Sequence, residues 1–273
     1  MSRYSTMIAI ALGIGLVTLA AGLATGSIAF LWNPEAIAIV VGGSLIAAAA
    51  GSTPRHLAET IKLLPALISR QPNAMSIAQW WIATNTSWRR EGISALQQFI
   101  GTAPSPSAAT ILQFCADGFD PDEIARLTEQ LLTTNAERYQ RAIVFFRRIA
   151  GYAPTMGIVG TVIGLASALA SGGDSATLLL QRIGFAFSAT LWGLVTANFL
   201  WLPIAQRFES MLQEQRTIDR LHVEAARLVA SGSTPLLTRY RLATLLPDTQ
   251  QQQLLDHDAT ISSSAVVGSV THQ

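Results

Sequence analysis

The sequence predicts an all-α integral membrane protein with four transmembrane helices and a helical cytoplasmic domain between the second and the third. Only 13% of its 273 residues are charged, whereas a soluble domain carries about 25%. The mean hydropathy is +0.37. A bilayer is crossed by about 20 residues of helix. Four windows of about that length hold no Asp, Glu, Lys or Arg: Tyr4 to Pro34, Ala36 to Pro54, Ile149 to Gly173, and Ile183 to Gln206.

The first two helices are expected at about 6–31 and 36–53, joined by a turn at "WNPE". Asn33-Pro34 breaks the helix there, and Trp32 suits the membrane interface. Arg3 followed by an apolar run also occurs in secretory signals. The run is long for a signal, however, and no clear cleavage site follows it, so this helix is expected to remain.

The other two helices are expected at about 149–171 and 183–206, joined by "SGGDSATLLLQR". Apolar residues at helical spacing predict that both extend into the cytoplasm. The helix that begins at Pro121 would run unbroken into the third membrane helix, and the fourth would continue to a stop at Gly232. The predicted segments are 1–53, 54–148, 149–206 and a cytoplasmic tail at 207–273, which is Gln- and Ser-rich and expected to be disordered from about Gln250.

The orientation follows from the positive residues, which collect on the cytoplasmic side of membrane proteins. Residues 54–148 hold ten Lys and Arg and the tail holds six, while the two short connections hold only Arg182. Both termini and the large polar segment are therefore predicted to be cytoplasmic, in a multi-pass protein whose hairpin tips lie outside.

Signatures of catalysis are missing from the sequence. There is no Gly-rich loop followed by Lys-Ser or Lys-Thr, and no Ser-His-Asp or Cys-His arrangement stands out. The lone Cys115 reads as a core residue, and the net charge of +1 gives no reason to expect nucleic acid. We therefore expect neither an enzyme nor a cofactor. A metal site is not expected either, because the four histidines are scattered along the chain: His56, His222, His257 and His272.

A face of small residues marks the third membrane helix, at Gly157, Gly160 and Gly164. Small residues allow close helix contact in lipid. The face could pack on the fourth helix of the same chain, or on another subunit or a central partner.

Thr161 and Thr190 place hydroxyls within the membrane helices. Each could bond a carbonyl one turn back on its own helix, or line a hydrated ion path. Intramembrane ionisable groups normally mark such paths, and these windows contain none. If the protein moves ions, the titrating group must come from another chain. Pro154 and Pro203 lie at similar depth near the cytoplasmic ends, either as plain kinks or as bends in a channel.

These residues carry a resemblance to a known family. "YAPTMGIVGTVIGL" and "FAFSATLWGLVTANFLWLPIAQRFE" resemble the third and fourth helices of the MotA family of flagellar stator subunits, and more loosely ExbB and TolQ. "WNPEAIAIVVGGSLIAAAAGSTPRHL" resembles the MotA front rather than the three-helix layout of ExbB and TolQ. "SWRREGISALQQFI" and "RLHVEAARLVASGSTPLLTRYRLATLLP" resemble its cytoplasmic parts, so the similarity runs over most of 1–247.

The resemblance implies a homopentamer in the bacterial inner membrane, ringing a dimer of a MotB-like partner. That partner would have a single membrane helix, a peptidoglycan-binding domain and the membrane aspartate that carries the ion. Ion flow would turn the ring and drive a cytoplasmic rotor. Pro154 and Pro203 match the family's channel-end prolines, Thr190 its hydroxyl near the partner's aspartate, and Thr161 a position that varies with the ion.

Two departures from the family pattern matter. Arg89 matches a rotor-binding arginine, but Gln97 stands where a glutamate is expected, which leaves Arg89, Arg90 and Glu91 as candidate rotor residues. Ala189-Thr190 replaces the two adjacent threonines of sodium-driven members, which favours H+ over Na+, although Thr161 argues the other way.

The leading hypothesis is therefore a proton-driven stator subunit. The first alternative is an ExbB- or TolQ-like unit that energises envelope transport or non-flagellar motility. The second is a non-conducting membrane scaffold, in which the small-residue face and the cytoplasmic helices serve assembly alone.

Overall fold

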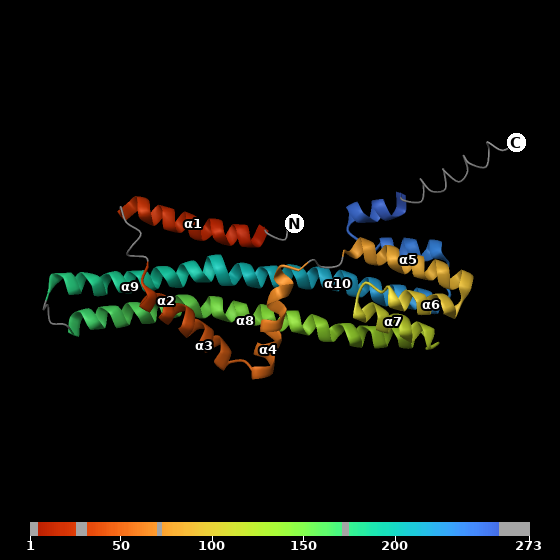
Figure 1. Ribbon diagram of the computed structural model, residues 1–273, viewed down its shortest axis with the longest axis horizontal. Helices are drawn as coiled ribbons and strands as arrows, with labels where there is room; N and C mark the ends of the chain where they lie inside the picture. The colour runs from red at the N-terminus through yellow and green to blue at the C-terminus, as the bar shows by residue number, and fades with distance from the viewer. Residues whose placement is uncertain (1–4, 26–31, 70–72, 171–174, 257–273) are drawn as a thin grey trace. The chain divides into compact units, whose positions relative to one another are not determined.

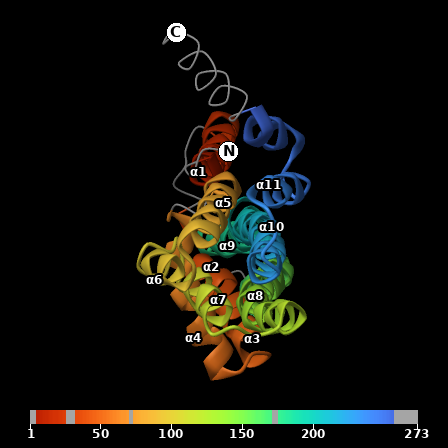
Figure 2. The ribbon, with the colours of Figure 1, turned by 90° about the vertical axis from the view of Figure 1, so that its right-hand side faces the viewer.

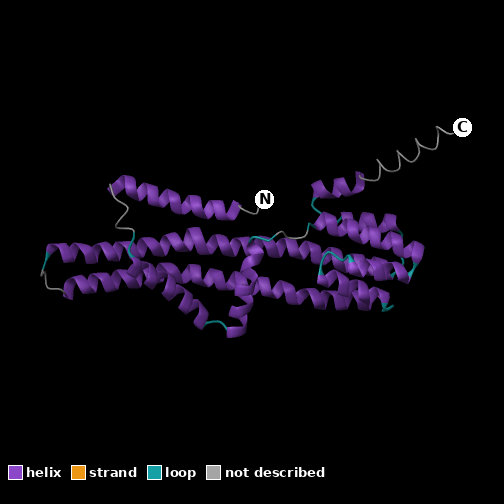
Figure 3. Cartoon of the chain, in the orientation of Figure 1, coloured by secondary structure: helices purple, strands orange, loops and turns teal. Residues whose placement is uncertain are grey.

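The structure, a computed structural model, describes residues 5–25, 32–69, 73–170 and 175–256 (Figure 1). Within these ranges the regular secondary structure is entirely helical (Figure 3), which confirms the all-α prediction. The chain divides into two compact units. Unit 1 comprises Met1–Arg70 and Arg138–Met211, and unit 2 comprises Gln71–Glu137 and Leu212–Gln273.

Two of the described helices are long and apolar enough to cross a membrane, Pro121–Ala170 and Ala176–Ala230. They contain the third and fourth predicted membrane helices. The first and second fall on shorter apolar helices, Ile8–Ala20 and Pro34–Ala50. The count of four membrane spans therefore stays a prediction.

The front of unit 1 consists of α1 (Ser5–Thr25) and a second helix built from α2 (Pro34–Ile37), a π-helical turn η2 (Ala38–Gly42) and α3 (Gly43–Ala50). Residues 26–31 of the first predicted helix lie outside the described residues. The second helix begins two residues before the predicted start. The side chain of Asn33 accepts a hydrogen bond of 3.2 Å from the Ala36 amide, and Pro34 takes a first-turn position where no N–H is needed.

The helices that contain the third and fourth predicted membrane segments are longer than those segments. α8 (Pro121–Ala170) is unbroken, which confirms the predicted continuity and includes Pro154. α9 (Ala176–Thr196), the π-helical turn η4 (Ala197–Trp201) and α10 (Leu202–Ala230) follow one another directly. α9 begins seven residues before the predicted 183 because Ser175 caps it, accepting a hydrogen bond of 3.1 Å from the Leu178 amide.

Aromatic side chains hold these two long helices together within unit 1. The ring of Phe146 stacks on those of Trp201 and Phe208, with centroids 6.2 and 5.7 Å apart. Phe208 is fully buried, and Phe146 and Trp201 nearly so. Since offset aromatic pairs add to the free energy gained from burial, this cluster fixes the register of α8 against η4 and α10.

Unit 2 is a helical cluster around one apolar core. It contains α5 (Ala74–Glu91), α6 (Ile93–Gly101), α7 (Pro106–Ala116) and α11 (Pro235–Ala243), with parts of α8 and α10. α5, α6 and α7 pack in succession, and α11 packs on α5 (Figure 2). Fully buried residues of the core come from all of these helices, among them Trp81, Leu96, Ile111, Ile124, Leu221 and Leu242.

Gly232 ends α10, as predicted. Its φ of 65° is left-handed, a conformation that glycine adopts without steric cost. The Ser233 amide bonds the Leu228 carbonyl at 3.0 Å, which closes the helix in a Schellman turn. The expected disorder from Gln250 does not start there, because residues 248–256 form a further helix. That helix is anchored by the buried Leu254, and residues 257–273 lie outside the described ranges.

A buried polar pair lies within this core. The indole N–H of Trp81 on α5 donates to Nδ1 of His222 on α10 at 2.9 Å. Burial lowers the pKa of His222 from 6.5 to about 4, so the ring is neutral and can accept this bond. Nearby on α10, burial raises the pKa of Asp219 to about 6, against a hydrogen bond from Gln215.

We expect acid to destabilise unit 2 through His222. Between about pH 4 and 6.5 the unfolded chain binds a proton that the folded chain excludes. The free energy of unfolding therefore decreases as the pH is lowered through that window. The loss is roughly 3 kcal/mol when complete. Asp219 acts in the opposite direction between 3.8 and about 6, because there the folded chain binds the extra proton.

Thermal unfolding of the detergent-purified protein as a function of pH tests this pair. Asp219→Asn should make the acid loss steeper than in the wild type, and His222→Gln should flatten it. Parallel profiles for all three proteins would contradict the assignment.

Candidate functional site

The candidate site lies where α8 and α9 run side by side in unit 1 (Figure 1). Gly157, Gly160 and Gly164 all face α9. A Cβ added to Gly157 would lie 3.0 Å from the Ala189 carbonyl oxygen, and one on Gly160 would lie 2.6 Å from the Ala189 Cβ. One on Gly164 would lie 2.8 Å from the Phe185 ring. Within this chain, therefore, α9 occupies the small-residue face.

Glycine on α9 completes this contact. A Cβ on Gly193 would lie 2.8 Å from the Ala153 carbonyl oxygen, 3.2 Å from the Gly157 Cα and 3.3 Å from the Pro154 Cα. These are main-chain atoms, which cannot move aside as a side chain can. Gly193 was not among the residues predicted from the sequence. A signal was available, because glycines on facing membrane helices favour close approach.

The close approach brings the two predicted hydroxyls together. Oγ1 of Thr161 and Oγ1 of Thr190 are 2.5 Å apart, across 29 residues of sequence. Oγ1 of Thr161 is also 2.9 Å from the Gly157 carbonyl oxygen, one turn back, and 3.3 Å from the Ala186 carbonyl oxygen. Thr161 thus has the backbone partner of the first alternative and further partners on α9, and a role of the pair in an ion path stays a prediction.

The proton count of this pair has a chemical consequence. Each hydroxyl has one proton to donate and two lone pairs that accept. If Thr161 donates to the Gly157 carbonyl, Thr190 donates to Thr161. The oxygen of Thr190 then keeps lone pairs for a water, a hydronium ion or an acid from outside the chain. Both side chains are only partly buried, so such a group has access.

The two prolines take different places in the structure. Pro154 lies inside α8 next to Gly193, and its ring removes one N–H from the helix. Pro203 stands at the start of α10, two residues after η4. π-Helical turns are frequent at functional sites and bend helices. In η4 the Leu202 amide bonds the Ala197 carbonyl, five residues back.

The candidate rotor residues lie together at the end of α5 in unit 2. Arg89, Arg90 and Glu91 are all exposed, as is Gln97 on α6. Arg89 has a structural contact as well, because it donates to the Gly232 carbonyl in the turn after α10. Its guanidinium therefore supports the packing of unit 2, which the sequence did not predict.

The described residues contain no group of three or more His, Cys, Asp or Glu side chains that could hold a metal ion. The site at α8 and α9 is built from hydroxyls, carbonyl oxygens and glycines. Its chemistry is hydrogen bonding, since a threonine hydroxyl does not titrate in the physiological range.

The chain is similar in sequence and in fold to known membrane proteins. Residues 86–219 match the model of the MotA/TolQ/ExbB proton channel family. Motility protein A of Bacillus subtilis is 27% identical over 240 residues, which cover 86% of this chain and 88% of the relative. The solved flagellar MotAB stator complex from Bacillus subtilis matches at 25% identity with a TM-score of 0.82, covering 91% and 98% of the two chains. C. jejuni MotAB has the same TM-score at 21% identity, covering 91% of this chain and 97% of that one.

Through residues 86–219 the chain is similar to the MotA/TolQ/ExbB proton channel family, which is a family of channels rather than of enzymes. The chain is MotA-like, because its similarity to motility A proteins extends over nearly their whole length and includes the helices of unit 2.

Proposed function

We propose that the chain is an ion-conducting stator subunit, which forms its ion path together with a MotB-like partner. The observation that carries the proposal is the Thr161–Thr190 hydroxyl pair, 2.5 Å apart on two apolar helix segments, within 149–173 and 183–206, that contain no acid. A relay of this kind needs a titrating group beside it. The partner's membrane aspartate would supply that group and exchange its proton next to Thr190.

The arrangement in the membrane follows from the same proposal. Four helices cross the bacterial inner membrane, in 1–53 and 149–206, and both termini are cytoplasmic. The segments 54–148 and 207–273 lie in the cytoplasm. Five copies would surround a partner dimer, and the chain would have neither enzymatic activity nor a cofactor. Pro154 and Pro203 would bend α8 and α10 near the cytoplasmic end of the path.

The proposed ion is the proton. A sodium ion prefers several oxygen ligands, as hard cations do. Ala189 directs a methyl group toward Gly160 where a second hydroxyl would otherwise stand. Two threonine oxygens that already bond each other suit a proton relay better than a cation cage.

Ion flux in vesicles that hold the chain and its one-helix partner tests the function. An imposed pH gradient should drive proton uptake with both chains present, and background leak should be seen with either alone. Uptake that needs sodium would overturn the choice of ion. No flux under any gradient would favour the alternative of a non-conducting scaffold.

The proposed output is torque on a cytoplasmic rotor through Arg90 and Glu91 at the end of α5. A specific observation keeps the second candidate, an ExbB- or TolQ-like unit for envelope transport or non-flagellar motility. The exposed Gln97 is neutral, so one charge for rotor recognition is missing.

We expect Arg90→Glu to abolish rotation while proton flux stays within about twofold of the wild type. Reversing an exposed charge changes partner recognition more than folding. Arg90 is a cleaner choice than Arg89, whose guanidinium also bonds the Gly232 carbonyl. The measurement is bead rotation in cells that lack their own stator. Arg138→Glu, at another exposed arginine, is the matched control, and unchanged rotation in Arg90→Glu would favour the second candidate.

A further inference from the structure

A basic cavity lies in unit 1 between the start of α4 (Pro54–Leu63) and α8. Its volume is about 260 Å³, several times the roughly 30 Å³ that a water occupies in the liquid. The polar side chains on its wall are those of Ser52, Thr53, His56, Thr60, Gln140, Arg141 and Arg148. None of the residues discussed for the ion path or the rotor lines it.

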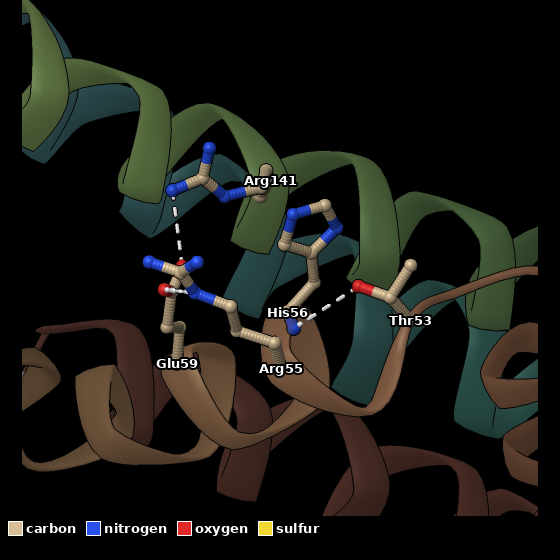
Figure 4. Close-up of polar contacts among 5 residues, drawn as sticks. All are labelled: Thr53, Arg55, His56, Glu59 and Arg141. Atoms are coloured by element: carbon tan, nitrogen blue, oxygen red, sulfur yellow. Dashed lines mark hydrogen bonds and ion pairs between the residues drawn. The ribbon is translucent and has the colours of Figure 1, made fainter.

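The cationic groups of the cavity are held in place by contacts around it. Arg148 donates to the Gly51 carbonyl at 2.9 Å. Arg141 donates to Glu59 at 3.0 Å, and Arg55 bonds the other oxygen of Glu59 at 3.3 Å. Figure 4 shows the Glu59 carboxylate between the two guanidinium groups. Although partial burial opposes it, hydrogen bonds and charge from Arg141 and then Arg55 keep the pKa of Glu59 below its usual value.

The balance of charge on the cavity wall is positive. Among the described residues that line it, Arg141 and Arg148 are cationic and none is acidic, while Arg55 and Glu59 lie beside it. The imidazole of His56 points toward α8 (Figure 4). The first turn of α4 also borders the cavity. Oγ1 of Thr53 caps this helix by accepting a hydrogen bond of 3.4 Å from the His56 amide. Arginine forks and hydroxyls together form the donor set that proteins use for phosphate oxygens.

The apolar side of the cavity gives the second argument. Leu57, Val144 and Phe145 also line it, and Val144 is 38% exposed. The uncharged window of α8 starts at Ile149, directly after Arg148. The cavity thus lies where charge gives way to apolar surface, at the depth where a headgroup phosphate meets the first carbons of its lipid.

We propose that this cavity binds the phosphodiester headgroup of an anionic phospholipid from the cytoplasmic leaflet. The inference rests on the cytoplasmic orientation proposed above, not on ion conduction. The phosphate oxygens would accept from Arg148, Arg141, His56 and the hydroxyls, while the glycerol and the first acyl carbons lie on Val144. A bound lipid would join α4 to α8 where Glu59 already does.

Lipid binding to the purified chain–partner complex tests the proposal. The probes are phosphatidylglycerol, phosphatidylcholine and inorganic phosphate. The readouts are copies of retained lipid by native mass spectrometry and the shift of the unfolding midpoint. The wild type should retain phosphatidylglycerol in preference to phosphatidylcholine. Arg148→Gln and His56→Gln should each weaken that binding at least tenfold.

Arg147→Gln is the matched control, since Arg147 is the adjacent arginine, pairs with Glu209 at 2.7 Å and does not line the cavity. It should bind the lipid within twofold of the wild type. Equal loss in all three variants would show diffuse charge attraction and overturn the site, as would no loss in any. If inorganic phosphate gave the full shift and displaced the lipid, a free anion would be the occupant and the proposal would fall.

Two further variants keep the test decisive. Arg148→Gln also loses the Gly51 contact, so if it fails to assemble, His56→Gln carries the result, with Arg148→Lys expected to restore part of the binding. Thr190→Val should bind lipid like the wild type, so failure of the ion path and failure of the lipid site can be told apart.

Discussion

Thr190→Val is expected to reduce proton flux to the background leak while the complex still assembles. Valine has nearly the shape of threonine and removes only the hydroxyl. Thr161 keeps its hydrogen bond to the Gly157 carbonyl, so no buried donor is left unpaired, and the cost in stability should be about 1 kcal/mol or less. What is lost is the Thr190 oxygen, which in the proposed relay offers its lone pairs to a partner acid.

The control for this variant stands six residues along the same chain. Oγ1 of Thr196 donates to the Trp192 carbonyl at 2.7 Å, within its own helix. Thr196→Val therefore removes a hydroxyl of the same kind that has no partner on α8, and it should conduct normally. The measurement is proton uptake by vesicles at equal amounts of assembled complex. Normal uptake in Thr190→Val would mean that its hydroxyl is structural, and the proposed ion path would have to be abandoned.

The second large effect is expected at Gly193. A Cβ there would lie within 2.8 to 3.3 Å of main-chain atoms of α8, closer than packed atoms tolerate. Gly193→Ala must push α9 away from α8, which should cost about 1–3 kcal/mol, as overpacking does. The same shift would part Thr161 from Thr190. We therefore expect a lower unfolding midpoint and a loss of flux together.

A second glycine-to-alanine variant separates this contact from the general effect of glycine on helix stability, because the two variants should change the unfolding midpoint in different directions. Gly184 lies on the same helix, and a Cβ there would meet nothing within 4 Å. Gly184→Ala should be neutral or stabilising, because alanine favours helix over glycine by up to about 1 kcal/mol. Unfolding of the two detergent-purified variants is the measurement. Equal midpoints would show that α8 and α9 are not in close contact at Gly193.

Local features of the structure were largely predictable from the sequence. The continuity of α8 from Pro121 to the end of its apolar segment and the stop at Gly232 both follow from residue type and apolar spacing, which act within a few residues. The features that were predicted wrongly are local as well. Ser175 and Asn33 cap their helices and so start them earlier than the charge windows indicated. Leu254 anchors a helix in a segment whose composition alone suggested disorder.

The sequence by itself determined that the chain is helical, that two of its helices are long and apolar, and that the windows 149–173 and 183–206, which hold Thr161 and Thr190, contain no acid. Only the tertiary structure decided which groups meet: Thr161 with Thr190, Gly193 with the α8 backbone, Trp81 with His222, and Arg89 with the Gly232 carbonyl. The physical reason is range. Helix propensity, capping and hydropathy act along the chain. Contacts between residues 29 to 143 positions apart depend on how close two backbones come, and between α8 and α9 glycines without a Cβ set that distance.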